Sequence, residues 1–82
     1  MYKILLLPKA QKDLDRFTGR TFEKLVEKIT DLQGDSRPPG CERMTAEDGY
    51  RIRSGDYRTV YRIDDKAREV FVYRIKHKKE AY

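Results

Sequence analysis

The chain has 82 residues, which allow one small hydrophobic core, so we expect a single domain over residues 1–82. The sequence has one cysteine and one histidine, which exclude an internal disulfide and a cysteine–histidine zinc site. It has no apolar stretch long enough to cross a membrane and no signal-peptide pattern, so we expect a cytoplasmic protein with no membrane partner. Nineteen Lys and Arg against fourteen Asp and Glu give a net charge of +5, which favours a polyanionic partner, either nucleic acid or an acidic protein.

A strand and two helices are predicted in the first half of the chain. The apolar run Tyr2–Leu7 predicts a strand, and Pro8 suits the first turn of a helix, where a missing N–H costs nothing. Apolar residues at helical spacing predict an amphipathic helix over residues 9–17 and a second one from the N-cap Thr21 to Leu32. Glycine and proline then predict a loop over Gln33–Gly40.

The second half of the chain has the pattern of a β-meander. Cys41–Thr45 fits a short extended piece, and two β-rich segments within Tyr50–Ile63 flank the turn Ser54–Asp56. Arg68–Ile75 is apolar on both faces, as expected of a central strand. The order β-α-α-β-β-β predicts an α+β fold, in which a helical hairpin covers one face of a small antiparallel sheet and leaves the other face open to a ligand.

The hairpin concentrates arginine at one end. Strand alternation places Arg51 and Arg53 on one side with Ile52 on the other, and Arg58 begins the return strand close to the same end. Surface strands often carry an isolated arginine, but three converging guanidinium groups suit phosphate, because each planar fork binds two oxygens and stays protonated.

The sequence gives less support to other kinds of catalytic site. His77 has no second histidine to form a ribonuclease pair, and an ordinary thiol is the favoured interpretation of Cys41, although a dyad between the two stays open. Asp64 and Asp65 indicate a turn rather than a metal site. We therefore expect a site without metal or cofactor.

The C-terminal tail could complete such a site. Nearby arginines lower the pKa of a lysine and of a tyrosine alike, so Lys78 or Tyr82 could act as a general base beside them. A solvated chain end is an equally good interpretation of this tail from its composition.

Together these segments resemble the RelE/ParE superfamily of bacterial and archaeal toxin components. The likeness covers the whole chain and rests on the runs Tyr50–Arg53, Gly55–Arg58 and Tyr61–Ile63, the following strand and the tail His77–Tyr82. The RelE branch implies an mRNA interferase, a ribosome-dependent endoribonuclease that inhibits translation by metal-independent 2′-hydroxyl attack on the scissile phosphate. It also implies a cognate RelB-like antitoxin, with DNA contacted only indirectly through the antitoxin complex.

The resemblance also implies site residues. In the RelE branch, basic residues on the second and third strands and an Arg/Tyr pair near the C-terminus form the site, which here correspond to Arg51, Arg53, Arg58, Lys78 and Tyr82. Lys78 departs from the family's usual arginine. Two alternatives stay open, a ParE-like inhibitor of DNA gyrase and an inactive relative that only binds an antitoxin. The aromatic and basic neighbours expected to contact RNA are Tyr50, Tyr61, Arg74, Lys76, His77 and Lys79.

Overall fold

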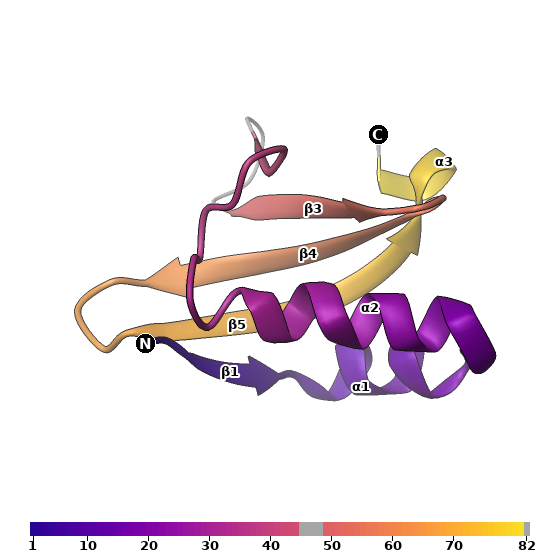
Figure 1. The fold of residues 1–82 in the computed structure, drawn as a ribbon, viewed down its shortest axis with the longest axis horizontal. Helices are drawn as coiled ribbons and strands as arrows, with labels where there is room; N and C mark the ends of the chain where they lie inside the picture. The colour runs from indigo at the N-terminus through magenta and orange to yellow at the C-terminus, as the bar shows by residue number, and fades with distance from the viewer. Residues whose placement is uncertain (45–48, 82) are drawn as a thin grey trace.

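The computed structural model describes residues 1–44 and 49–81, and in it two helices lie on one side of a five-stranded sheet (Figure 1). A short third helix follows the last strand. The elements are β1 (Lys3–Leu6), α1 (Pro8–Asp15), α2 (Gly19–Asp31), β2 (Glu42–Arg43), β3 (Tyr50–Ser54), β4 (Tyr57–Asp64), β5 (Glu69–His77) and α3 (Lys78–Ala81).

The two long helices form where apolar spacing predicts them, with one shifted start. Pro8 is the first residue of α1, as expected from its missing N–H. Helix α2 begins at Gly19, two residues before the predicted N-cap Thr21, and the N-cap is Thr18. Gly19 has a φ of 61°, a left-handed value that favours glycine and lets the chain turn sharply from α1 into α2.

The sheet has the order β1-β5-β4-β3-β2. The antiparallel meander predicted for β3, β4 and β5 is confirmed, and the extended piece after the loop is present as β2, which pairs with β3. The sheet is mixed rather than wholly antiparallel, because β1 runs parallel to β5. A tight turn fixes the direction of the next strand, whereas β1 is separated from its neighbour by both helices, so no turn dictates its direction.

The hydrophobic core lies between the helical hairpin and the sheet. It is formed by apolar side chains from both helices and from β3, β4 and β5, with Tyr61 among those that are fully buried. Within the described residues, every helix is too short or too polar to pass through a bilayer. The main buried side chains are Ala10, Leu14, Leu25, Ile29, Leu32, Ile52, Tyr61, Val70, Val72 and Ile75.

An arginine ties the loop after α2 to the turn between β4 and β5. The Arg37 guanidinium donates to both carboxylate oxygens of Asp65, at 3.0 and 3.2 Å, and its Nε donates to the Tyr50 hydroxyl at 3.0 Å. The Tyr2 hydroxyl donates to the same Asp65 carboxylate at 2.7 Å. This cluster, the Arg37 clamp, joins four separate segments at one end of the sheet.

Candidate functional site

A cross-strand row of cations lies at the opposite end of the sheet. Arg53 on β3 is opposite Arg58 on β4, which is opposite Lys76 on β5. Directly opposed residues share a face of the sheet, and the adjacent rung contains the core residue Ile52, so the row projects from the face away from the helices. The strand alternation expected for Arg53 is therefore confirmed.

The three members of the row differ in exposure. Arg53 is exposed and Lys76 is half-buried, whereas Arg58 is only 6% exposed. Arg58 Nη1 donates to the carbonyl oxygens of Gly55 and Tyr57, both at 3.0 Å, so this side chain also holds the β3–β4 turn. The row thus combines one fully accessible guanidinium with one built into the turn.

Arg51 has a different environment from the one expected. It shares a side of β3 with Arg53, but its Nη2 lies 3.3 Å from a carboxylate oxygen of Glu42, and the side chain is 16% exposed. Glu42 belongs to β2, which pairs with the first half of β3. The ion pair offsets part of the positive charge that a phosphate would meet at Arg51.

The C-terminal segment folds back beside the β3–β4 turn. The Lys78 backbone N–H donates to the Asp56 carbonyl oxygen at 2.7 Å, and the Lys78 ammonium lies 3.5 Å from the Asp56 carboxylate. His77 packs edge-on against Tyr57, with ring centroids 5.5 Å apart. Lys78 is therefore placed next to the row, while Tyr82 lies outside the described residues.

The rest of the tail adds exposed charge at the same end. Lys79 is exposed, and its backbone N–H donates to His77 Nδ1 at 3.2 Å. This contact places the His77 ring beside the start of α3.

Three residues expected to contact RNA are engaged elsewhere. Tyr61 is fully buried, and its hydroxyl donates to the Ser36 carbonyl at 2.9 Å. Burial raises the pKa of this phenol, so it stays protonated. Tyr50 stacks on Tyr61 with centroids 5.8 Å apart and accepts the Arg37 bond, on the side of β3 that carries Ile52 rather than Arg53. The prediction that Tyr61 contacts RNA is therefore wrong.

The third of these residues is Arg74, which faces a helix. Its Nε donates to the Asp13 carboxylate of α1 at 2.8 Å. A register shift between β4 and β5 at Val60/Tyr61 breaks the simple alternation just before Arg74. This irregularity has no signature in the sequence, and it removes Arg74 from the row.

Sequence reasoning missed Asp56 as a member of the site. The sequence indicates only a turn at Asp56, whereas in the structure its carboxylate is the acidic neighbour of Lys78. An acidic residue between Arg53 and Arg58 in a basic hairpin is the signal that could have drawn attention to it. Over residues 1–44 and 49–81, no cluster of His, Cys, Asp and Glu is arranged to hold a metal ion.

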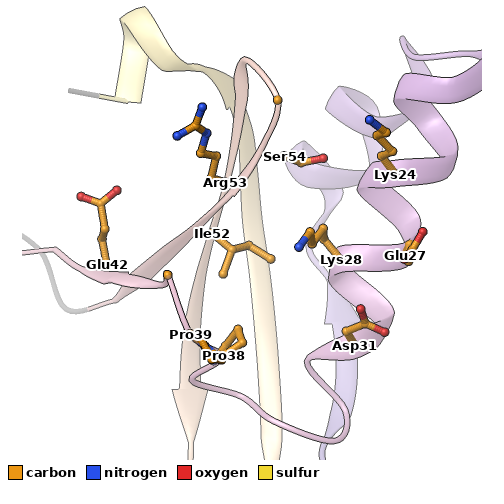
Figure 2. Close-up of a pocket in the computed structure, with 12 residues that line it drawn as sticks. Lys24, Glu27, Lys28, Asp31, Pro38, Pro39, Glu42, Ile52, Arg53 and Ser54 are labelled. Atoms are coloured by element: carbon orange, nitrogen blue, oxygen red, sulfur yellow. The ribbon is translucent and has the colours of Figure 1, made fainter.

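A groove of about 730 Å³ runs between α2 and β3, next to the row (Figure 2). We call it the α2–β3 groove. A second hollow of about 240 Å³ lies between the start of α2 and the β3–β4 turn. The groove is lined, among others, by Lys24 and Lys28 of α2, Pro38 and Pro39 of the loop, and Ile52 and Arg53 of β3.

Comparison with known families places nearly the whole chain in one of them. Residues 4–82 match the sequence model of the ParE toxin of type II toxin-antitoxin systems, parDE. The chain belongs to this toxin family. The resemblance to the RelE/ParE superfamily is thereby confirmed, and this toxin is a component of a type II toxin-antitoxin system. Comparison with curated protein sequences gives no match.

Solved structures agree with the fold of this toxin. The RelBE2 toxin-antitoxin complex of Mycobacterium tuberculosis is similar, with 26% identity and a TM-score of 0.80, over 93% of this chain and 96% of that chain. The intact RelBE complex of Escherichia coli matches with 25% identity and a TM-score of 0.80, over 94% and 96%. A YoeB/ParE toxin from Agrobacterium tumefaciens shares the fold at 18% identity and a TM-score of 0.78, over 92% and 96%. The RelE-like α+β fold is confirmed.

Proposed function

We propose that this toxin is an endoribonuclease of the RelE type, which cuts mRNA on the ribosome and so stops translation in the cytoplasm. The observation that supports this most strongly is the row of Arg53, Arg58 and Lys76, with Lys78 held at the adjacent turn. Several cations at one end of an open sheet face suit a phosphate and the extra negative charge that develops on it during cleavage.

The chemistry needs two proton transfers and a site for one phosphorane. The 2′-oxygen loses its proton and forms a bond to the adjacent phosphorus, and the bond from phosphorus to the 5′-oxygen breaks as that oxygen gains a proton. The products are a 2′,3′-cyclic phosphate and a 5′-hydroxyl. Arg53 and Arg58 would stabilise the phosphorane, and the Asp56–Lys78 pair offers a carboxylate to accept one proton and an ammonium to donate the other. Tyr82 remains a predicted member of the site.

The test of this proposal uses Arg53 rather than Arg58, because Arg58 also holds the turn. Primer extension on a message translated in vitro should show cuts in the ribosomal A site, and Arg53→Ala should reduce their rate on the order of 10²- to 10³-fold. Lys66→Ala, an exposed change in the distant β4–β5 turn, should leave the rate unchanged. Halted translation of a message that stays intact would contradict the proposal.

We also propose a RelB-like antitoxin as the partner, since the similar structures from M. tuberculosis and E. coli are toxin-antitoxin complexes. An acidic antitoxin segment that folds on binding would suit the exposed cations of this chain. Contact with DNA would then be made by the antitoxin within the complex.

A second candidate function is inhibition of DNA gyrase, which the match to the ParE toxin model favours. A gyrase inhibitor needs binding but no RNA chemistry. Purified toxin that blocks gyrase supercoiling, with Arg53→Ala equally potent, would support this candidate over the ribonuclease.

A further inference from the structure

One flank of α2 carries a regular row of three cations, Arg20, Lys24 and Lys28. They are four residues apart, so they lie along one stripe of the helix with about 6 Å of rise between neighbours. Like charges at this spacing disfavour a helix rather than support it. We call these three residues the α2 cation row.

The α2 cation row faces the edge of the sheet. Lys24 and Lys28 line the α2–β3 groove, and Arg20 and Lys24 line the hollow beside the β3–β4 turn. In Figure 2, Lys24 and Lys28 extend from α2 toward β3. Glu27 also lines the groove from α2. The row therefore borders a depression made of the groove and the adjoining hollow, which share Lys24, Ser54 and Gly55 as lining residues.

Arg53 joins this depression to the proposed catalytic site. It lines the α2–β3 groove from β3 and is also the exposed end of the cross-strand row. The acidic groups Glu27, Asp31 and Glu42 also line the groove, and Asp31 lies with Pro38 and Pro39 at the end far from the β3–β4 turn. Lys24 and Arg53 lie in the half of the groove next to that turn.

These cations are available to a ligand. Arg20, Lys24, Lys28 and Arg53 are all exposed. In the part of the chain that the structure describes, none of the four takes part in an ion pair. The pairs that do form join Arg37 to Asp65, Arg51 to Glu42, Arg74 to Asp13 and Lys78 to Asp56.

We propose that the α2 cation row binds backbone phosphates of the RNA strand that flanks the scissile phosphate. The inference rests on the proposed ribonuclease function, because Arg53 would hold the strand at the point where the two surfaces meet. The row spans about 12 Å of helix with one cation about every 6 Å, so it can face about three successive phosphates of an extended strand. Evenly spaced, solvated cations match the regular charges of a nucleic acid backbone, and the binding needs no base sequence.

The test compares a short and a long RNA. Fluorescence anisotropy would measure binding of 2′-O-methyl oligonucleotides, which are not cleaved, of about four and about fourteen nucleotides. Lys24→Ala/Lys28→Ala should weaken binding of the long oligonucleotide on the order of tenfold at 0.1 M salt and reduce its salt slope by about 1.4, because two single-strand phosphate contacts are lost. Binding of the short oligonucleotide should not change.

The matched control is Lys9→Ala/Lys12→Ala, which removes the same charge from exposed positions on α1. It should leave both affinities close to wild type, and thermal unfolding should show that both variants are folded. The inference would be overturned if the two double variants changed RNA affinity equally, or if Lys24→Ala/Lys28→Ala weakened binding of the short and the long oligonucleotide equally. Neither result would contradict the ribonuclease proposal. Failure of the wild-type toxin to bind either oligonucleotide would also overturn the inference, while the ribonuclease proposal would still be decided by primer extension, because that activity is proposed to occur on the ribosome. If Lys24→Ala/Lys28→Ala lost binding to polyglutamate but kept its binding to RNA, the row would instead be a binding surface for an acidic protein.

Discussion

Asp13 shows how much one carboxylate contributes to this fold. It is 8% exposed and accepts bonds from Arg74 Nε at 2.8 Å and from the Ile75 backbone N–H at 2.9 Å. These bonds fasten α1 to β5 beside the register shift. Burial alone would raise the pKa of Asp13, but the Arg74 and Ile75 bonds, with the charges of Arg74 and Arg16, outweigh it and hold the pKa below its usual value.

We expect Asp13→Ala to lower the free energy of unfolding by about 2 kcal/mol at pH 7, because Arg74 and the Ile75 N–H both lose their acceptor. A carboxyl whose pKa is depressed by folding stabilises the native state above its unfolded pKa of about 3.9 and stops doing so as the pH falls through the folded value. The difference between wild type and variant should therefore be constant from pH 7 to 5 and shrink below pH 4. Urea unfolding across this range measures it.

Asp15→Ala is the control, since Asp15 is exposed on the same helix and contacts Gln11. It should change stability by well under 1 kcal/mol at every pH. If Asp13→Ala were still less stable than wild type by the full amount at pH 3, the charge of Asp13 would not be the cause of the lost stability.

At single positions, strand alternation explains which side-chain placements could be predicted. It placed Arg51 and Arg53 together, and applied to β4 it would also have put Tyr61 beside Thr59 on the buried face, so the error at Tyr61 was avoidable. Arg74 was not predictable in this way. Its orientation depends on a register shift and on Asp13, a residue distant in sequence, and neither leaves a local pattern.

The element that organises the site is the β3–β4 turn. Gly55 adopts a φ of 59°, Arg58 binds the carbonyls on either side of Asp56, and Lys78 is held by Asp56. The turn thus sets the positions of a guanidinium, a carboxylate and an ammonium that come from three different segments.

Gly55→Ala should lower the free energy of unfolding by about 1 kcal/mol, because a side chain disfavours this left-handed backbone. No atom lies within 4 Å of the added Cβ, so the cost comes from the backbone alone. Urea denaturation would measure it, with Gly34→Ala as a control, since Gly34 has no positive φ and an added Cβ there would meet only the Asp31 carbonyl oxygen, at 4.0 Å. Equal effects of the two changes would refute this account of the turn.

The limits of prediction at this scale follow from what local sequence encodes. Turn residues and β-rich runs located the meander, and helical spacing located α1 and α2. Helix α3 and the contact of Lys78 with Asp56 were not foreseen, because a four-residue helix has no periodicity to recognise and the contact joins distant segments.

Across the whole molecule, the Arg37 clamp and the proposed active site are located at opposite ends of the sheet. The Arg37 clamp lies at the end of the β4–β5 turn, and the cation row with Lys78 lies at the end of the β3–β4 turn (Figure 1). Strands β4 and β5 run the full distance between them. The two ends can therefore be changed separately.

We expect Arg37→Ala to lower the free energy of unfolding by about 1 kcal/mol and to leave RNA cleavage unchanged. The loss of stability is modest because the Arg37 and Asp65 side chains are 42% and 57% exposed. Lys78→Ala should do the reverse, with unaltered unfolding and much slower cleavage. Thermal unfolding and primer extension on both variants would measure this. If Arg37→Ala stayed folded but lost RNA cleavage, the clamp and the proposed active site would not be independent of each other.

The parallel pairing of β1 with β5 has a consequence for the order of folding. Lys3 aligns with Glu69 and Leu6 with Val72, so this ladder closes a loop that contains most of the chain. The meander needs only short loops, so its ladders should form first and β1 should dock last. Pulse-labelled hydrogen exchange during refolding would then protect the amides of β4 before those of β1. The first strand to be synthesised would be the last to join the sheet.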